Sequence, residues 1–499
     1  MSITKHQLAR VLSAVLIAVL LIASGWIGFT YYGSLPTSDH DTKQTDSHIS
    51  QTDLADDNTE PTEETLHIKT VKIKSPVAIF AEESTESDKL AVINKKMELE
   101  YISESDLFYK VKYAGTRIGW ITKSRGEVTE KNVTVKHAPK GVSDAPFDLA
   151  QTKEGADIAD ILYNYGTMGA SVAVIKNGRV AYHYEYGYAN KENDVKVSEN
   201  TKFRIASVSK VFTAMLAMAE TDEGVLDLDK DLSEIMGFKV CHPAYSGAPV
   251  TTRMLLTHSA GLKDKSDMFS KSISSVSSDK RYYASKPGTR FNYSNLGIGI
   301  AGAVVEKSAN KTISQYARDK FLEPMGIDAS FDAKYLSDPS LVADCYAGNK
   351  IHHSSAFLTR SQERGKPGDV FHLGQGGLLI SSEDLARLMT LLINDGQYDG
   401  RQYLSSEAVR QMLTRQDVDT KSAFDQCIGI RRYSKLVGKH DLYYHNGDSY
   451  GIYSLMAIDP ADKSGVAVIT SGAYAQRKKN TVFDVCDDVL NYAYGEILN

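Results

Sequence analysis

The run Phe203-Arg204-Ile205-Ala206-Ser207-Val208-Ser209-Lys210-Val211-Phe212 decides the fold of most of this 499-residue chain. It leads into an apolar run with helical spacing, so we expect Ser207 and Lys210 on one face of a helix. A serine hydroxyl needs an adjacent base to become a nucleophile. A lysine serves as that base when burial or nearby charge favours its neutral form. The stretch therefore predicts a nucleophilic serine, although a capping serine and a surface lysine would show the same spacing.

Two further motifs follow along the chain and favour the catalytic interpretation. Tyr293-Ser294-Asn295 follows the segment 286–292, and His445-Asn446-Gly447 leads into an apolar strand pattern. A phenol becomes a usable base when an ammonium group lies beside it, because the positive charge lowers its pKa. The amide of Asn295 both donates and accepts hydrogen bonds, so it is suited to hold a substrate amide.

The three motifs resemble those of the penicillin-recognising serine hydrolases, which include class C β-lactamases, D,D-carboxypeptidases, D-aminopeptidases and related esterases. The motifs of that family are Ser-x-x-Lys, Tyr-x-Asn, and Lys-Thr-Gly or His-x-Gly. The stretches 255–262 and 376–386 are also similar to the family, and the resemblance covers the chain from about residue 145 to residue 499. It implies an α/β domain with an antiparallel sheet flanked by helices, a helical subdomain, and an active site in the cleft.

The resemblance implies roles for the residues of the first two motifs. Ser207 is expected to form an acyl-enzyme, and Lys210 to take or relay its proton. Tyr293 is expected to be the second proton-transfer group, either as a phenolate base or as a shuttle to the leaving group. Which of the two residues is the general base stays open at this point.

The third motif departs from the β-lactamase pattern, because His445 stands where those enzymes usually carry lysine. A histidine is a cation only when it is protonated, and its ordinary pKa is near neutrality. Gly447 is expected to let the edge strand approach the substrate closely. The backbone N–H groups of Asp448 and Ser207 are expected to form the oxyanion hole. The histidine speaks against an efficient β-lactamase.

The N-terminal residues predict a membrane anchor. Lys5 and Arg10 precede an apolar run from Val11 to about Tyr32, which is long enough to span a bilayer as a helix. The flanking charges place the N-terminus inside and the remainder outside the cell. We expect residues 1–33 to be an uncleaved signal anchor, with a cleaved signal peptide as the alternative. Residues 34–65 are acidic and poor in large apolar side chains, as is typical of an extended disordered linker.

Short alternating segments between residues 66 and 130 predict a small antiparallel all-β barrel. The Gly119-Trp120-Ile121 pattern and the strand spacing resemble bacterial Src-homology-3-like domains, which often bind peptidoglycan peptides. A short linker is expected at 131–145 and the hydrolase domain at 146–499. In that domain, Asn177-Gly178 predicts a hairpin, and strand patterns return at 440–444, 452–458 and 465–469 before a helix at 483–498. One sheet is therefore expected to form from both ends of the domain.

Charge and motif content exclude several other classes of function. A net charge of −6 without a basic stripe argues against a nucleic-acid partner. No zinc-binding or phosphate-loop motif is present, so neither a metal nor another cofactor is expected. The four cysteines, Cys241, Cys345, Cys427 and Cys486, are either paired in one of three ways or buried as thiols.

Together these patterns predict a membrane-anchored extracytoplasmic serine hydrolase. Its expected substrates are amides or esters of the cell envelope, with D-alanyl peptides or D-alanyl esters first. A class C-like β-lactamase is one alternative. A penicillin-binding or wall-binding protein that acylates without turnover is the other.

Overall fold

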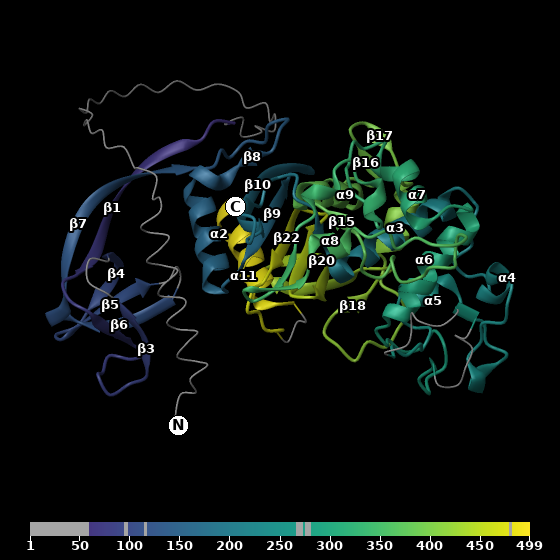
Figure 1. The fold of residues 1–499 in the computed structure, drawn as a ribbon, viewed down its shortest axis with the longest axis horizontal. Helices are drawn as coiled ribbons and strands as arrows, with labels where there is room; N and C mark the ends of the chain where they lie inside the picture. The colour runs from purple at the N-terminus through teal and green to yellow at the C-terminus, as the bar shows by residue number, and fades with distance from the viewer. Residues whose placement is uncertain (1–58, 94–97, 114–116, 266–272, 275–280, 479–481) are drawn as a thin grey trace, which may run out of the picture. The chain divides into compact units, whose positions relative to one another are not determined.

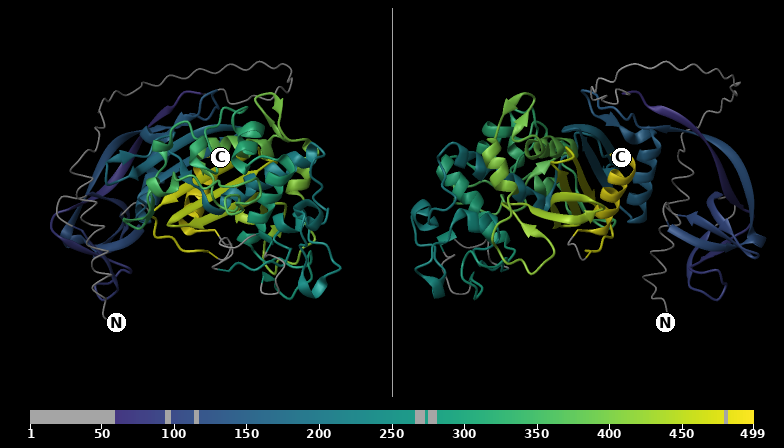
Figure 2. Two further views of the ribbon diagram at one scale, coloured as in Figure 1. Left: turned by 45° about the vertical axis from the view of Figure 1, so that its right-hand side comes forward. Right: turned by 180° about the vertical axis from the view of Figure 1, so that it is seen from behind.

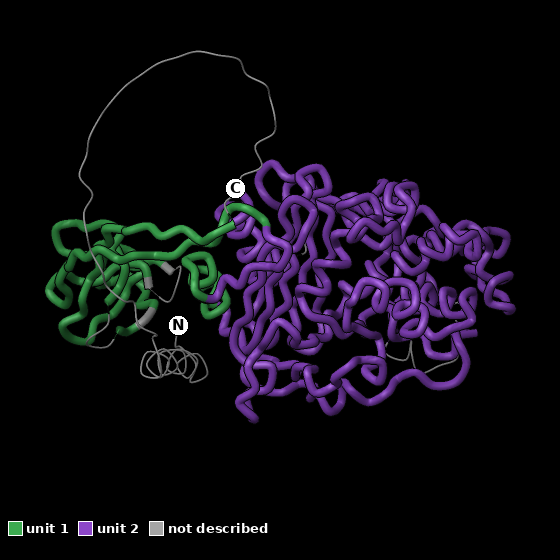
Figure 3. The backbone as a smooth tube through the Cα atoms, turned by 90° about the horizontal axis from the view of Figure 1, so that it is seen from above, with its two compact units in different colours: residues 1–142, 151–164 green, residues 143–150, 165–499 purple. Residues whose placement is uncertain are grey.

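The computed structural model describes residues 59–93, 98–113, 117–265, 273–274, 281–478 and 482–499. The chain divides into two compact units: residues 1–142 with 151–164, and residues 143–150 with 165–499 (Figure 3). The expected signal anchor and most of the acidic linker lie outside the described residues. Within the described part of the chain, no helix is both long and apolar enough to cross a membrane.

The first unit is built on one antiparallel sheet of seven strands, as the alternating sequence predicts. Its core consists of alternate residues that point to one side, among them Val71, Ile79, Val111 and Ile121. The strands, in spatial order, are β3 (Lys89–Ile93), β2 (Val77–Phe80), β6 (Arg117–Thr122), β5 (Phe108–Tyr113), β4 (Glu98–Glu104), β1 (Thr62–Ile73) and β7 (Gly126–His137). The resemblance to Src-homology-3-like domains stays a prediction.

The prediction of a linker at 131–145 is wrong for residues 131–137, which belong to strand β7. Strand β7 continues to His137 and pairs with β1 along its whole length, from Ile73↔Gly126 to Thr62↔His137. Helix α2 (Lys153–Asn164), expected in the hydrolase domain, belongs to the first unit. Glu154 at its start accepts hydrogen bonds from His137 at 2.8 Å and from the Ala138 N–H at 3.0 Å.

The second unit contains a nine-stranded sheet made from both ends of the domain, which confirms that prediction. The hairpin at Asn177-Gly178 joins β9 to β10, and β9 pairs on its other side with β22, where Ala173 lies opposite Ala467. All strand pairs in this sheet are antiparallel except that of β8 with β10. The strands are β8 (Phe147–Asp148), β9 (Gly169–Lys176), β10 (Arg179–Asn190), β11 (Val195–Lys196), β18 (Asp425–Gln426), β19 (Arg431–Val437), β20 (His440–Ser449), β21 (Ile452–Asp459) and β22 (Ser464–Ser471).

Helices cover both faces of this sheet. Helix α11 packs on β21 and β22 from one side, while α9 packs on β9, β10 and β22 from the other (Figures 1 and 2). Three two-stranded ribbons complete the unit: β12 (Phe203–Arg204) with β15 (Leu379–Ile380), β13 (Cys345–Ala347) with β14 (Lys350–His353), and β16 (Gln397–Tyr398) with β17 (Arg401–Gln402). The α-helices of the unit are α3 (Ser209–Asp222), α4 (Leu232–Met236), α5 (Thr252–Leu256), α6 (Asn295–Ala309), α7 (Ile313–Ala317), α8 (Ser355–Leu358), α9 (Ser382–Ile393), α10 (Ser406–Leu413) and α11 (Asp484–Tyr492).

Helix α3 lies at the centre of the unit and carries the reactive stretch. Its residues from Ser209 to Glu220 are all buried, because α6 and α10 pack around it. A helix that is enclosed on every side holds its side chains rigidly. The short 3-10 turn η3 (Ala206–Val208), which immediately precedes α3, contacts β20 and β21. The first and third sequence motifs are therefore neighbours.

Candidate active site

The first motif forms a hydroxyl–amine pair. Lys210 Nζ lies 2.9 Å from Ser207 Oγ, as the three-residue spacing predicts. The amine also donates to the backbone carbonyl of Gln375. Ala206, just before the serine, has a φ of +49°, a left-handed conformation that costs a residue with a Cβ roughly 1–2 kcal/mol. Such strain is common at functional sites, and here it belongs to the turn that presents Ser207.

Lys210 is fully buried and is positioned to act as a base. Burial lowers its pKa well below the usual 10.5, and the positive charges of Arg204 and Arg431 add to that effect against the attraction of Asp264. No carboxylate among the described residues lies within ion-pair distance of the amine. The neutral amine is therefore favoured, and a neutral amine accepts a proton from a hydroxyl.

Tyr293 joins the same group from the N-terminal end of α6. Its phenol hydrogen-bonds to the Ser207 side chain. Lys210 Nζ lies 5.2 Å from the centre of the Tyr293 ring, and the Arg431 guanidinium lies 5.5 Å from it. Burial raises the pKa of Tyr293 above 10, in spite of the Arg431 charge. The protonated phenol is thus the resting form, which suits a proton donor better than a phenolate base.

Two residues that the motifs do not include hold Tyr293 and Asn295 in place. The ring of His258 lies 4.4 Å from that of Tyr293, and its Nδ1 accepts the Ser294 N–H at 3.1 Å. Asp264 accepts hydrogen bonds from Ser294 Oγ at 3.0 Å and from the Asn295 side chain at 2.9 Å. It also accepts the first two backbone N–H groups of α6 at 2.8 and 3.0 Å. Asn295 is therefore oriented by Asp264 at the rim of the site.

His445 does not behave as the sequence suggests. The near-neutral pKa expected of a histidine is wrong here. Burial lowers its pKa well below 6.5, and Arg431, Lys210 and His258 lower it further. Its Nδ1 lies 2.8 Å from the Asn446 carbonyl, which only accepts, so the proton sits on Nδ1 and Nε2 is left as an acceptor. The ring is neutral and supplies no positive charge for a substrate.

Gly447 is required for packing between strand and turn. A Cβ at this position would lie 2.6 Å from the Ile205 carbonyl and would overlap the Ser454 hydroxyl. The close approach expected of this glycine is therefore to the turn that carries Ser207. Ser454 Oγ donates to the same Ile205 carbonyl at 2.7 Å and fixes the turn against β21. The backbone of β20 at Asp448 thereby lies next to the nucleophile, as an oxyanion hole requires.

Several of these residues line one cleft of about 1000 Å³. The pairing of β19 with β20 ends at Arg431↔Tyr444, so residues 445–449 of β20 pair with β21 alone in the described chain. The other edge of this segment is open beside Ser207. An extended chain is able to add to such an edge through backbone hydrogen bonds. Ser207, Tyr293, Asn295 and Asp448 all line this cleft, whereas His445 and Lys210 lie behind it.

Arg431 is the functional residue that sequence reasoning missed most clearly. It begins β19, lies in the wall of the cleft, and donates to Asn446 Oδ1 at 3.4 Å. Its guanidinium lies 4.7 Å from the Phe424 ring and 5.8 Å from the Phe291 ring. Arginine stacked on aromatic faces keeps its charge and its direction. No motif marks this position, because its role depends on a strand partner.

Other candidate groups lie outside the cleft. Ser209 bonds to the Ala206 carbonyl at 2.7 Å and to the Leu378 N–H at 3.1 Å, so it is a structural residue. The four cysteines are unpaired thiols. In the described part of the chain, two groups have ligands that suit a metal, Asp148/His183/Glu185 and His440/Asp459/Asp462, and none of the six residues lines the cleft.

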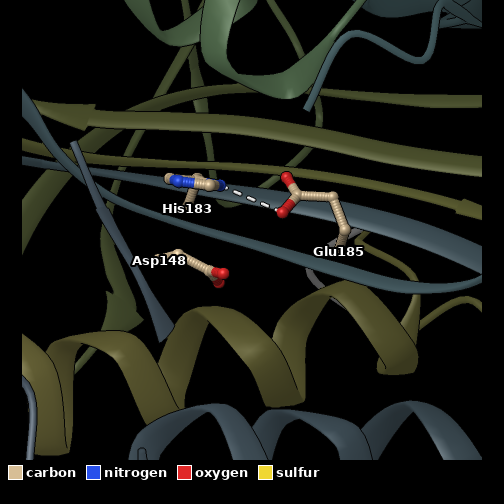
Figure 4. A group of neighbouring side chains, drawn as sticks. All are labelled: Asp148, His183 and Glu185. Carbon is tan, nitrogen blue, oxygen red and sulfur yellow. Dashed lines mark hydrogen bonds and ion pairs between the residues drawn. The ribbon is translucent and has the colours of Figure 1, made fainter. Parts of the chain in front are cut away.

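The first of these groups is readily explained as an ion pair (Figure 4). His183 Nδ1 lies 3.0 Å from Glu185 Oε2. Burial opposes protonation of the ring, but Glu185, with Asp148 and Glu383 nearby, outweighs it and raises the pKa of His183. Asp148 accepts the Ala150 N–H at 2.8 Å.

A serine hydroxyl beside a buried amine, a phenol and an open strand edge defines a serine hydrolase. The family model described as Beta-lactamase matches residues 151–485, and the chain belongs to this family.

Comparisons with individual proteins agree with that family. A β-lactamase of Pseudomonas fluorescens is 34% identical over 221 residues, which cover 42% of this chain and 59% of that protein. A Staphylococcus aureus protein named flp is 27% identical over 168 residues, which cover 32% of this chain and 33% of that protein. The chain thus spans about a third of the length of the flp relatives. The octameric penicillin-binding protein homologue from Pyrococcus abyssi is 26% identical with a TM-score of 0.53, covering 64% of this chain and 73% of that one.

Proposed function

We propose that this protein is a membrane-anchored, extracytoplasmic hydrolase of D-alanyl peptides or D-alanyl esters in the cell envelope, and that it acts through an acyl-enzyme on Ser207. The observation that carries the proposal is the 2.9 Å contact between a buried Lys210 and the Oγ of Ser207, which lines the same cleft as Arg431.

Acylation begins with the Ser207 proton. The neutral Lys210 amine accepts it while Ser207 Oγ attacks the substrate carbonyl carbon. The negative charge that develops on the carbonyl oxygen is stabilised by the backbone N–H groups of Ser207 and Asp448. The carbonyl of Gln375 holds the amine in place, and it also stabilises the ammonium that forms.

Tyr293 then serves the leaving group. Its protonated phenol hydrogen-bonds to Ser207, so it is placed to donate a proton to the departing nitrogen or oxygen as the tetrahedral intermediate collapses. Lys210 returns a proton to the phenol, and the acyl group stays on Ser207. In deacylation the same residues act in reverse, with water in place of the leaving group.

Arg431 supports a substrate whose leaving group carries a carboxylate. His445 is neutral, so the cation that lysine provides in β-lactamases is absent from the third motif. The Arg431 guanidinium lies beside Tyr293, on the side where the leaving group departs. A terminal D-alanine has a free carboxylate next to its amide nitrogen, and a guanidinium is a strong partner for a carboxylate. The apolar run at residues 11–32 and the acidic segment after it support an anchor that keeps the enzyme near the wall.

The test uses the full-length chain in detergent, as wild type and as Ser207→Ala. We would supply a peptide that ends in D-alanyl-D-alanine, a D-alanyl ester and a chromogenic cephalosporin, and measure release of D-alanine, alcohol and chromophore. We expect release of D-alanine or of the alcohol by the wild type, with loss of at least about 1000-fold in the alanine variant. Release that persists in Ser207→Ala would contradict the proposal.

Two other outcomes correspond to the alternative functions. Hydrolysis of the cephalosporin in preference to both D-alanyl substrates would assign a β-lactamase. A stable mass increase on Ser207 after a fluorescent penicillin, without hydrolysis of any substrate, would assign a protein that acylates without turnover. Membrane anchoring is tested separately, by comparing the full chain with a chain that begins at residue 34 for retention in the membrane fraction.

A further inference from the structure

Arg204 lies in the cleft of Ser207 with no acidic partner. It stands three residues before the nucleophile, in β12, and its side chain is partly exposed in the wall of the cleft. Within the described part of the chain, no carboxylate lies within 4.0 Å of its guanidinium. By contrast Arg477, which lines the same cleft, pairs with Asp448 at 3.5 Å. A largely buried charge without a counter-ion is costly unless a ligand supplies one.

The guanidinium of Arg204 is held in one position. Its Nη1 donates to Ser449 Oγ at 2.8 Å, and its centre lies 5.0 Å from the ring of Tyr450. That ring is supported from behind by His353, at 4.0 Å between centroids. Burial and the Arg204 charge both lower the pKa of His353, so this neighbour is neutral and competes for no anion. A fixed cation binds a ligand without a further loss of side-chain entropy.

One nitrogen of the guanidinium faces free space. A Cβ added at Gly376, which also lines the cleft, would lie 3.4 Å from Arg204 Nη2. Because position 376 has no side chain, a ligand oxygen has room to reach Nη2. Burial lowers the pKa of Arg204, which is consistent with a site that lacks its counter-ion.

Arg204 and Arg431 lie on opposite sides of the nucleophile along β20. Arg431 bonds to Asn446, just before Gly447, and Arg204 bonds to Ser449, two residues after it. Gly447 itself touches the turn that carries Ser207. Three residues of a strand span about 10 Å. Since the leaving group departs on the Tyr293 and Arg431 side, Arg204 serves the acyl side.

We propose that Arg204 is an anion subsite for the acyl donor, so that the preferred substrate carries a carboxylate on its acyl portion as well as on its leaving group. This inference rests on the proposed function and names the substrate class of the same cleft. The enzyme thereby selects a peptide with acidic groups on both sides of the scissile bond, about 10 Å or more apart along the strand.

The test compares substrates that differ only in this charge. One pair is succinyl-D-alanyl-D-alanine and its succinamoyl counterpart, in which the distal carboxylate is a neutral amide. A second pair carries the same two acyl donors on a nitrophenyl ester, which has no leaving-group carboxylate. For the full-length wild type we expect kcat/KM to favour the succinyl member by about 10- to 100-fold in each pair that is hydrolysed, since charge-assisted hydrogen bonds discriminate by that much. The preference is expected to shrink as salt rises.

Variants assign the preference to the guanidinium. In Arg204→Gln the ratio within a pair should fall to about one, and in Arg204→Lys it should fall part of the way. Gly376→Ala keeps the arginine but narrows the approach to Nη2, so it should also reduce the ratio. Ser449→Ala removes only the hydroxyl that accepts from Nη1, so most of the preference for the succinyl substrate should remain.

Three results would overturn the inference. The first is a wild-type ratio near one, and the second is a ratio that is unchanged in Arg204→Gln. The third is an equal loss of kcat/KM for both members of a pair in Arg204→Gln, which would mean that Arg204 only supports the Ser449–Tyr450 turn. Hydrolysis of the ester pair alone would exclude D-alanyl peptides and leave esters as the substrates, and the ratio within that pair would still measure the role of Arg204. Hydrolysis of neither pair would contradict both proposals.

Discussion

Two buried lysines lie eight residues apart and have opposite surroundings. Lys202 is 2% exposed, and its Nζ lies 3.0 Å from Asp384 and 3.7 Å from Asp328. Lys210 is fully buried, and its amine meets a hydroxyl and a carbonyl. Both lysines are removed from water to the same degree. The groups beside the amine therefore decide whether a buried lysine forms an ion pair or acts as a neutral base. Burial alone does not decide it.

The largest expected effect is on activity at Lys210. We expect Lys210→Met to lower kcat/KM by about 1000- to 10000-fold, because the proton acceptor of Ser207 is lost. Its stability should equal or exceed that of the wild type. The pKa of Lys210 is lowered in the folded state, so the unfolded chain binds this proton more tightly and the wild type loses stability as pH falls below 10.5. Kinetics of D-alanine release and urea unfolding measure the two effects. A Lys210→Met variant that is less stable than the wild type but keeps its kcat would show that Lys210 has a structural role and is not the base.

The same substitution at Lys202 should have the opposite result, with lower stability and nearly unchanged activity. Lys202→Met removes one of the two cations beside the buried Asp384, which keeps Arg387 at 3.1 Å. We therefore expect the free energy of unfolding to fall by about 3 kcal/mol, the lower end of what a broken buried ion pair costs. Activity per folded molecule should stay within a few-fold of the wild type. Active-site titration with a fluorophosphonate counts the folded molecules. A loss of activity at full stability would show that Lys202 acts in the cleft after all.

The pH dependence sharpens the assignment of Lys210 as the base. The base must be deprotonated, so kcat/KM should fall as pH drops through the lowered pKa of Lys210. The acid must be protonated, so activity should be lost only as pH rises through the raised pKa of Tyr293, above 10. His445 has a pKa well below 6.5, and no step from it is expected near that pH. A pH–rate profile that falls off near pH 6.5 in the wild type, but not in His445→Gln, would contradict this account.

The smallest effect concerns Asp264, the carboxylate that acts on Lys210 from a distance. Asp264→Asn should cost about 1–3 kcal/mol of stability and lower kcat several-fold, because Asn295 and the start of α6 lose their acceptor. The negative charge raises the pKa of Lys210, so its removal should move the acid limb of the profile to lower pH. Asp231→Ala, which removes the side-chain cap at the start of α4, is the control and should cost about 1 kcal/mol of stability without moving the pH profile.

The motif residues were readable from the sequence because their spacing is local. A spacing of three residues, from the turn η3 into the first turn of α3, brings Lys210 to Ser207, and this contact needs no information from elsewhere in the chain. The hairpin at Asn177-Gly178 and the strands at 440–471 follow from local turn chemistry and alternation. Local patterns did not predict the strand at residues 131–137. That part of β7 carries few apolar side chains and is held by backbone pairing to β1, which leaves no mark in composition.

The sequence by itself determined the pairing of Ser207 with Lys210, through their three-residue spacing, and a sheet built from both ends of the domain, through turn chemistry and strand alternation. The roles expected of Ser207 and Tyr293 came from the resemblance of their motifs to a known family. The tertiary structure decided the electrostatics. Arg431, Arg204 and Asp264 come from three separate parts of the chain, and only the fold brings their charges close enough to act on Lys210. Burial among these charges makes His445 neutral and favours the neutral form of Lys210. A pKa depends on the groups within a few ångströms in space, and no pattern along one chain records that neighbourhood.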